Sequence, residues 1–98
     1  MPRNLVIVPE AEEDLAKAKR WYDDQRMGLG QEFLQHVEQV FDRIRQWPEM
    51  HAVVREDVRQ ALVKRFPYVV CYRIVRNTIR VIAVYHGHRD PNTWQSRS

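Results

Sequence analysis

The sequence predicts an α+β fold, in which an N-terminal strand and a two-helix hairpin pack on a C-terminal antiparallel sheet. Three observations predict it. Residues 5–8 form a short β-branched run, apolar residues recur every three or four positions over residues 11–47, and they alternate with period two over residues 58–86. The second pattern is typical of one helix face and the third of one strand face. At 98 residues we expect a single domain over residues 1–98.

The first strand is expected at Leu5–Val8, and Pro9 ends it or opens the next element. A first helix then runs from Glu10 to about Gly28, because Gly28 and Gly30 bracket a turn. The acidic residues 12–14 lie in its first turns, where they complement the helix dipole. Its apolar stripe consists of Ala11, Leu15, Ala18 and Tyr22, with Trp21 beside it.

A second helix is expected from about Gly30 to Trp47, where Pro48 stops it. Two amphipathic helices joined by a short link form an antiparallel hairpin, whose apolar stripes need a cover. The stripe of this helix consists of Phe33, Val37, Val40, Ile44 and Trp47, and Leu34 and Phe41 widen it.

The rest of the chain supplies that cover as strands. A tight turn at residues 76–78 joins the last two strands into a hairpin, with Asn77 able to take a left-handed conformation. The N-terminal strand should pair with one of the later strands. The second helix should face Tyr68, Val70 or Tyr72. After an ambiguous stretch at residues 49–57, strands are expected at residues 58–64, 68–75 and 79–86.

Charge is unevenly distributed along the chain. Residues 1–50 carry seven Lys/Arg and ten Asp/Glu, a net of −3, and residues 51–98 carry nine and three, a net of +6. This asymmetry suits an acidic or polyanionic partner, or strand faces that need charge for solubility. The apolar runs are far shorter than the ~20 residues that cross a bilayer, no secretory leader opens the chain, and Cys71 is the single cysteine. We therefore expect a soluble, cytoplasmic protein without membrane contact.

Few residues carry a recognisable chemistry. The sequence holds no phosphate loop, no dinucleotide fingerprint and no set of metal ligands, so we expect no cofactor and no metal. His86 and His88 lie at the end of the last strand beside Arg89. There they suit proton transfer or phosphate contact, because His titrates near neutral pH and Arg binds phosphate in a bidentate manner. Alternatively, Arg89 and Asp90 pair with each other or brace the tail.

Basic residues of the second half could converge on one face of the sheet. Arg73 and Arg80 flank the same hairpin and should sit across from each other. A basic sheet face suits RNA or an acidic protein, although no aromatic RNA-recognition motif accompanies it. The full set is Arg55, Arg59, Lys64, Arg65, Arg73, Arg80, Arg89 and Arg97.

Nearly the whole chain resembles the RelE/ParE superfamily of bacterial toxins, and it is most similar to the ParE branch, often labelled plasmid-stabilisation proteins. The resemblance rests on the order and spacing of several segments rather than on one motif. The segments are residues 9–15 with Tyr22, residues 29–33, Trp47-Pro48, residues 65–72, residues 83–86, residues 88–91, and Trp94 with Arg97.

The resemblance implies a cognate antitoxin that wraps the toxin. Contact with DNA is then expected only indirectly, through this antitoxin. ParE-like toxins act on DNA gyrase without being enzymes, whereas RelE-like relatives cleave mRNA on the ribosome. Val69 stands where the cleaving branch usually has an Arg, and Trp94 or Gln95 stands where many of its members have a catalytic Tyr. These two departures favour DNA gyrase as the target. Arg89 and His86 do match positions of the cleaving branch. A ribosome-dependent mRNA endonuclease is therefore the alternative, as is a degenerate member that binds antitoxin but poisons nothing.

These hypotheses assign residues to three roles. Trp21 and Tyr22 lie near an edge of the helical hairpin and exceed what one narrow stripe requires, so this edge should receive an amphipathic antitoxin helix. The antitoxin-binding residues are Trp21, Tyr22, Leu29 and Leu34. The target-binding residues are Arg89, Trp94, Arg97, Arg73 and Arg80. If the chain cleaves RNA, the catalytic candidates are His86, His88, Arg73, Arg80 and Arg89.

Overall fold

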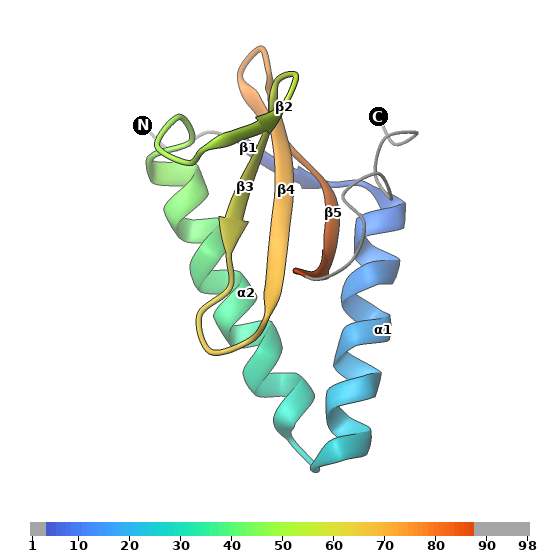
Figure 1. Ribbon diagram of the computed structural model, residues 1–98. Coiled ribbons are helices and arrows are strands. Elements are labelled where there is room, and N and C mark those ends of the chain that lie inside the picture. Colours follow the sequence, from blue (N-terminus) through green and yellow to red (C-terminus); the bar gives the residue numbers. More distant parts are fainter. Residues whose placement is uncertain (1–3, 88–98) are drawn as a thin grey trace.

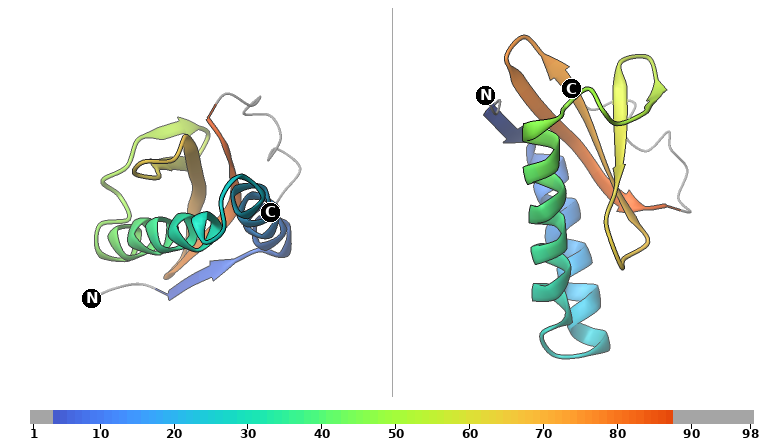
Figure 2. Two further views of the ribbon diagram at one scale, coloured as in Figure 1. Left: turned by 90° about the horizontal axis from the view of Figure 1, so that it is seen from below. Right: turned by 90° about the vertical axis from the view of Figure 1, so that its left-hand side faces the viewer.

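The computed structural model describes residues 4–87. One strand is followed by two helices and then by strands only, and both helices cover the same face of a single five-stranded sheet (Figures 1 and 2). The predicted α+β architecture is confirmed. The elements are β1 (Asn4–Ile7), α1 (Pro9–Gln25), α2 (Leu29–Gln46), β2 (Val53–Arg55), β3 (Val58–Leu62), β4 (Tyr68–Val75) and β5 (Thr78–His86).

The sheet is mixed rather than wholly antiparallel. Its strand order is β1-β5-β4-β3-β2, and β1 lies parallel to β5, from Asn4 opposite Thr78 to Ile7 opposite Val81. All other neighbouring strands are antiparallel. The expectation that the first strand pairs with a later one is correct, and its partner is the last strand. A parallel pair needs a long crossover connection, and the two helices begin that connection here.

The edge strand β2 is missing from the sequence-based prediction. It has three residues, all exposed, and pairs with β3 in an irregular register. A strand with no buried position shows no apolar alternation, which is why residues 49–57 are ambiguous in sequence. The neighbouring strand β3 ends at Leu62, two residues before the predicted end.

The core lies between α2 and the sheet. Phe33, Val37, Val40 and Ile44 are fully buried, and the ring of Phe33 lies 5.0 Å from that of Tyr68, as the predicted orientation requires. Phe41 is buried as well. The prediction was wrong for Trp47, which is 55% exposed: α2 ends at Gln46, and Trp47 has non-helical dihedral angles that turn it off the stripe. On α1, Leu15 is only partly buried.

The β4–β5 hairpin departs from regular alternation at one point. Cys71 lies opposite Ala83 but Tyr72 lies opposite Val81, so Ile82 is an extra residue in β5 and forms a bulge. In the turn, the left-handed residue is Arg76, with φ of 57°, and not Asn77 as expected. Strand β4 itself has no extra residue, so Tyr68 and Tyr72 share one face and Arg73 lies on the other.

Candidate functional site

A cavity of about 700 Å³ lies between α1 and the open end of the β4–β5 hairpin, where β4 begins and β5 ends. Helix α1 forms one wall, and the start of β4 and the end of β5 form the other. Five of the ten lining residues that the structure describes carry aromatic rings, so half of the lining residues are aromatic. The ten are Asp14, Lys17, Ala18, Trp21, Tyr22, Pro67, Tyr68, Val84, Tyr85 and His86.

Two consecutive residues of α1, Trp21 and Tyr22, play different parts at this cavity. Tyr22 is 8% exposed, and its ring contacts those of Phe33, Phe66 and Tyr68 at centroid distances between 4.9 and 5.9 Å. Burial, and to a lesser degree the neighbouring Tyr68, raise the pKa of the Tyr22 hydroxyl. Trp21 is 56% exposed and meets the Tyr22 ring edge-on at 5.0 Å. Tyr22 therefore belongs to the core and Trp21 to the surface.

The opposite wall is held by contacts at the open end of the hairpin. Tyr68 and His86 are register partners, and their rings lie 5.6 Å apart. The backbone N–H of Gly87 donates to the carbonyl of Pro67 at 2.8 Å, which extends the pairing beyond β5. The wall is thus fixed by backbone as well as side-chain contacts.

Asp14 joins the two walls, a role that the sequence did not reveal. Its carboxylate accepts a hydrogen bond of 3.1 Å from the backbone N–H of Val84 in β5. The sequence assigns the acidic residues 12–14 to the helix dipole alone, but Asp14 reaches a strand 70 residues away. No local pattern could have shown this contact.

The two arginines predicted to face each other do so. Arg73 and Arg80 are register partners near the turn of the hairpin. The guanidinium of Arg73 also forms an ion pair of 2.8 Å with Asp57, and its side chain is 25% exposed. Arg73 is therefore held within the chain by a carboxylate.

The structure does not bring His86 together with these arginines. Tyr68, the partner of His86, is five residues before Arg73 on β4, a separation of roughly 17 Å along a strand. His86 shares a face of the sheet with its partner Tyr68. Because Tyr68 and Arg73 are an odd number of residues apart on β4, Arg73 lies on the opposite face.

The predicted single basic face does not form within residues 4–87. Arg59 lies opposite Tyr72, and Arg73 follows Tyr72 in sequence, so the two arginines lie on opposite faces. Arg59 donates to the backbone carbonyls of Glu49 and His51 instead. Two of the predicted basic residues, Arg89 and Arg97, lie outside the described residues, as do His88 and Trp94.

Leu29 and Leu34, both predicted to contact an antitoxin, are partly buried and pack against the core. Neither lines the cavity, whereas Trp21 and Tyr22 do. The four predicted residues thus fall into two pairs at different places on the helical hairpin.

A partly buried polar network lies under the loop between α2 and β2. The hydroxyl of Tyr72 donates to the carbonyl of Pro48 at 2.5 Å and lies 3.2 Å from Nδ1 of His51. Burial raises the pKa of Tyr72 to about 12, against the opposing effect of Arg59. Burial also lowers the pKa of His51, and the nearby charges of Arg43 and Arg59 lower it further. The network fixes the loop on the central strand of the sheet.

Over residues 4–87 there is no helix with the length and apolarity needed to cross a membrane. The same residues contain no group of three His, Cys, Asp or Glu side chains that could hold a metal ion.

Comparison with known proteins places this geometry in context. Residues 5–91 match the sequence profile of the family described as "ParE toxin of type II toxin-antitoxin system, parDE". The chain is 31% identical over 93 residues to a protein named Toxin ParE2 from two strains of Mycobacterium tuberculosis, an alignment that covers 94% of this chain and 89% of that protein.

Two solved structures have the same fold. One is titled as the chromosomal ParDE TA system from P. aeruginosa, with a TM-score of 0.77, 16% identity, and coverage of 86% of this chain and 95% of that chain. The other is titled as the toxin-antitoxin complex RelBE2 from Mycobacterium tuberculosis, with a TM-score of 0.60, 21% identity, and coverage of 88% and 99%.

Proposed function

Because the chain belongs to the ParE toxin family of type II toxin–antitoxin systems, we propose that it inhibits DNA gyrase by binding to it and that a cognate antitoxin neutralises it. The observation that favours binding over catalysis is the separation of His86 from Arg73 and Arg80. RNA cleavage needs a proton-transfer group and a cation around the same phosphate. Among residues 4–87 the candidates for these two roles lie at opposite ends and on opposite faces of one hairpin.

A target surface would then draw on basic residues and the tail. Arg73 and Arg80 form one cationic pair on the sheet, and Arg89, Trp94 and Arg97 are the further candidates. A target carboxylate that bound Arg73 would have to replace Asp57, its present partner. Arg73 would therefore bind a target carboxylate only by exchanging one carboxylate partner for another.

A cognate antitoxin is the proposed protein partner, and contact with DNA would run through it. The titles of the two similar structures describe toxin–antitoxin assemblies. In this chain, Trp21 supplies an exposed aromatic surface beside a cavity, with Tyr22 beneath it. Leu29 and Leu34 would add a second, smaller contact on α2.

The test is expression without the antitoxin, followed by separate measurements of plasmid supercoiling and mRNA cleavage. Growth arrest with loss of negative supercoiling and intact mRNA is the expected result, and purified gyrase should be inhibited in the same way. Cleaved mRNA with normal supercoiling would assign the chain to the RelE-type endonucleases. Normal growth with retained antitoxin binding would identify a degenerate member.

A further inference from the structure

We propose that Arg73 and Arg80 form a clamp for a backbone phosphate of DNA, and that the bulge at Ile82 assembles this clamp. The inference rests on the proposed function, because a toxin that acts on DNA gyrase works beside DNA. It adds a direct contact between the free toxin and DNA to the contact that would run through the antitoxin.

The bulge decides on which face of the sheet Arg80 lies. Without Ile82 as an extra residue, the register at the open end of the hairpin would continue to the turn and place Arg80 opposite Ile74, on the face that packs against α2. With the bulge, Arg80 lies opposite Arg73, on the other face. A shift of one residue moves the side chains beyond it to the other face, and bulges are typical of places where a side chain is re-aimed.

Two arginines opposite each other are a costly arrangement for a sheet. Side chains at such positions start from Cβ atoms about 5 Å apart, and like charges there destabilise the strand pair. The hairpin, residues 68–86, has a third arginine in its turn, Arg76, and contains no Asp or Glu. The bulge thus brings together two positive charges that a regular hairpin would keep on separate faces, which is what an anion-binding site requires.

Arg73 is already positioned to bind a further group. Its ion pair with Asp57 at 2.8 Å holds the guanidinium in place, and its side chain remains 25% exposed. Its Nε is buried and has no hydrogen-bond partner among the described residues. Buried donors are nearly always satisfied in native proteins, so this one calls for a partner from outside the chain. A bound anion provides an oxygen for it.

The arrangement favours a phosphate over a carboxylate. The two oxygens of a carboxylate lie in one plane and suit a single guanidinium, and Arg73 already has a carboxylate partner in Asp57. The oxygens of a phosphate point in different directions, so guanidiniums on two neighbouring strands can each bind one. A third arginine at the same end of the hairpin suits a chain of phosphates. DNA is the polyanion that the proposed function brings to the toxin.

The test measures how tightly the purified full chain, without antitoxin, binds a fluorescent DNA duplex of mixed sequence at several salt concentrations. Arg80→Gln and Arg73→Gln should each weaken binding roughly tenfold or more, the effect of losing hydrogen bonds to a charged group. Each should also reduce the slope of log affinity against log salt by about 0.9, the contribution of one phosphate in B-DNA. The double variant should reduce the slope by the same amount, because both arginines bind one phosphate.

Two further variants separate a clamp from the general effect of charge. The matched control, Arg26→Gln, removes an arginine that also has a carboxylate partner, Glu32. Arg26 belongs to the link between α1 and α2, which lies at the opposite end of the molecule from the turn of the β4–β5 hairpin (Figure 1). This control should leave the slope unchanged and change the affinity by less than about twofold, because salt screens distant exposed charges. Arg80→Lys keeps the charge but loses the planar fork, so it should keep the slope and lose affinity.

Circular dichroism and thermal melting verify that the variants fold. If Arg73→Gln does not fold once Asp57 has lost its partner, the two Arg80 variants still decide the question. Slopes and affinities of the Arg80 variants that match those of Arg26→Gln would overturn the clamp. A double variant that lowers the slope by about 1.8 would mean two separate phosphates and would also overturn it.

The remaining outcomes concern other occupants and the proposed function. Tighter binding of single-stranded RNA of the same length, lost in the same variants, would assign the clamp to RNA instead of DNA. Weakened binding to gyrase with unchanged affinity for DNA would assign it to an acidic segment of gyrase. Wild-type protein that inhibits gyrase but binds no DNA would overturn the clamp alone. Wild-type protein that binds DNA through the clamp but leaves gyrase active would overturn the gyrase proposal alone.

Discussion

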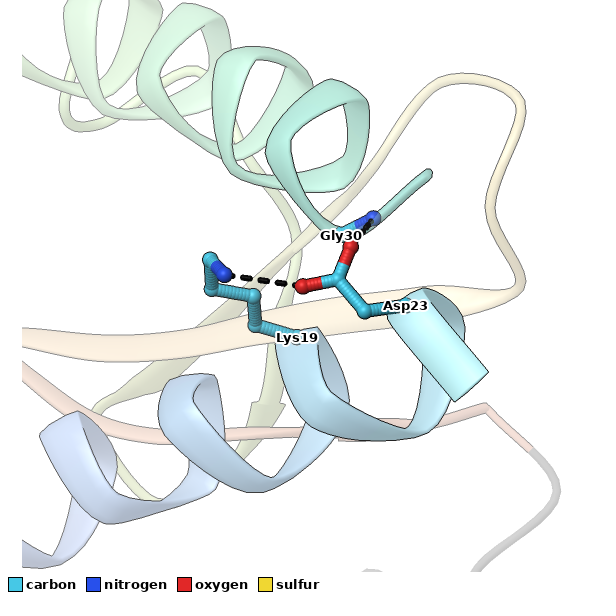
Figure 3. A network of polar contacts seen from close by, with 3 residues as sticks. All are labelled: Lys19, Asp23 and Gly30. Atoms are coloured by element: carbon cyan, nitrogen blue, oxygen red, sulfur yellow. Dashed lines mark hydrogen bonds and ion pairs between the residues drawn. The ribbon is translucent and has the colours of Figure 1, made fainter. Parts of the chain in front are cut away.

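The carboxylate of Asp23, near the end of α1, accepts a hydrogen bond of 2.8 Å from the backbone N–H of Gly30 in the first turn of α2 (Figure 3). The N-cap residue of α2 is Gly28, which has no side chain to cap the helix, so Asp23 provides an acceptor from the neighbouring helix. Its second oxygen binds the ammonium of Lys19 at 2.8 Å. Lys19, Asp23 and Gly30 therefore join the end of α1 to the first turn of α2.

Gly30→Ala should destabilise the protein by about 1–3 kcal/mol, the usual range for overpacking. A Cβ at this position would lie 2.5 Å from the backbone carbonyl of Lys19 and 2.7 Å from the carboxylate of Asp23. Urea denaturation measures the effect. Gly87→Ala is the control, because its Cβ would meet the nearest atom at an ordinary 3.6 Å. Equal stability of the two variants would show that the helices separate easily.

Asp23→Asn should lower stability at neutral pH and have little effect in acid. Its hydrogen bonds with Lys19 and then Gly30 hold the pKa of Asp23 below its ordinary value of 3.8. A lowered pKa means that the stabilisation is complete above the unfolded value and is lost as the pH falls through the folded value. As the pH falls through these two pKa values, the free energies of unfolding of the wild type and of Asp23→Asn should therefore converge, which chemical denaturation at several pH values measures. The exposed neighbour provides the control: Asp24→Asn should follow the wild type throughout.

Ile44→Ala should cost about 2–4 kcal/mol and Trp47→Ala less than about 1 kcal/mol, although both residues belong to the same predicted stripe. Ile44 is fully buried, so its truncation leaves a cavity, whereas Trp47 is 55% exposed beyond the end of α2. Chemical denaturation of the two variants measures the difference. Comparable losses would mean that Trp47 packs on the core after all.

These cases show what the sequence could predict and why. Periodicity reports burial within one element, so it located Phe33 and Ile44 and the strands that face them. It cannot report contacts between distant segments, such as the parallel pairing of β1 with β5 or the hydrogen bond of Asp14 with Val84. For the site, Trp21 was found because it exceeds what its stripe needs. The opposite wall, with Tyr68 and His86, depends on strand register, which no local pattern contains.

Stability should fall as the pH drops below about 6.5, and His51 should account for part of the fall. Because burial, Arg43 and Arg59 lower the folded pKa of His51, the unfolded chain takes up a proton first as the pH falls. The loss therefore grows below the unfolded pKa and levels off below the folded one. Denaturation of wild type and His51→Gln at about pH 7.5, above the unfolded pKa, and at about pH 5.5, below it, measures this loss. On acidification the variant should lose less stability than the wild type. Equal losses of stability would show that His51 does not contribute to the pH dependence.

Toxicity should survive His86→Gln and decline in steps as basic and tail residues are removed. A catalytic proton-transfer group typically contributes 10²–10⁴-fold to rate, so its loss would abolish RNA cleavage at once. Binding to gyrase has no such group, and each contact would contribute a part of the affinity. We therefore expect Arg80→Ala, Arg89→Ala, Trp94→Ala and Arg97→Ala each to weaken growth arrest more than His86→Gln does. Growth without antitoxin measures this, with circular dichroism and antitoxin binding confirming that each variant folds. Purified protein that cuts mRNA on ribosomes, and that His86→Gln inactivates, would overturn the gyrase proposal.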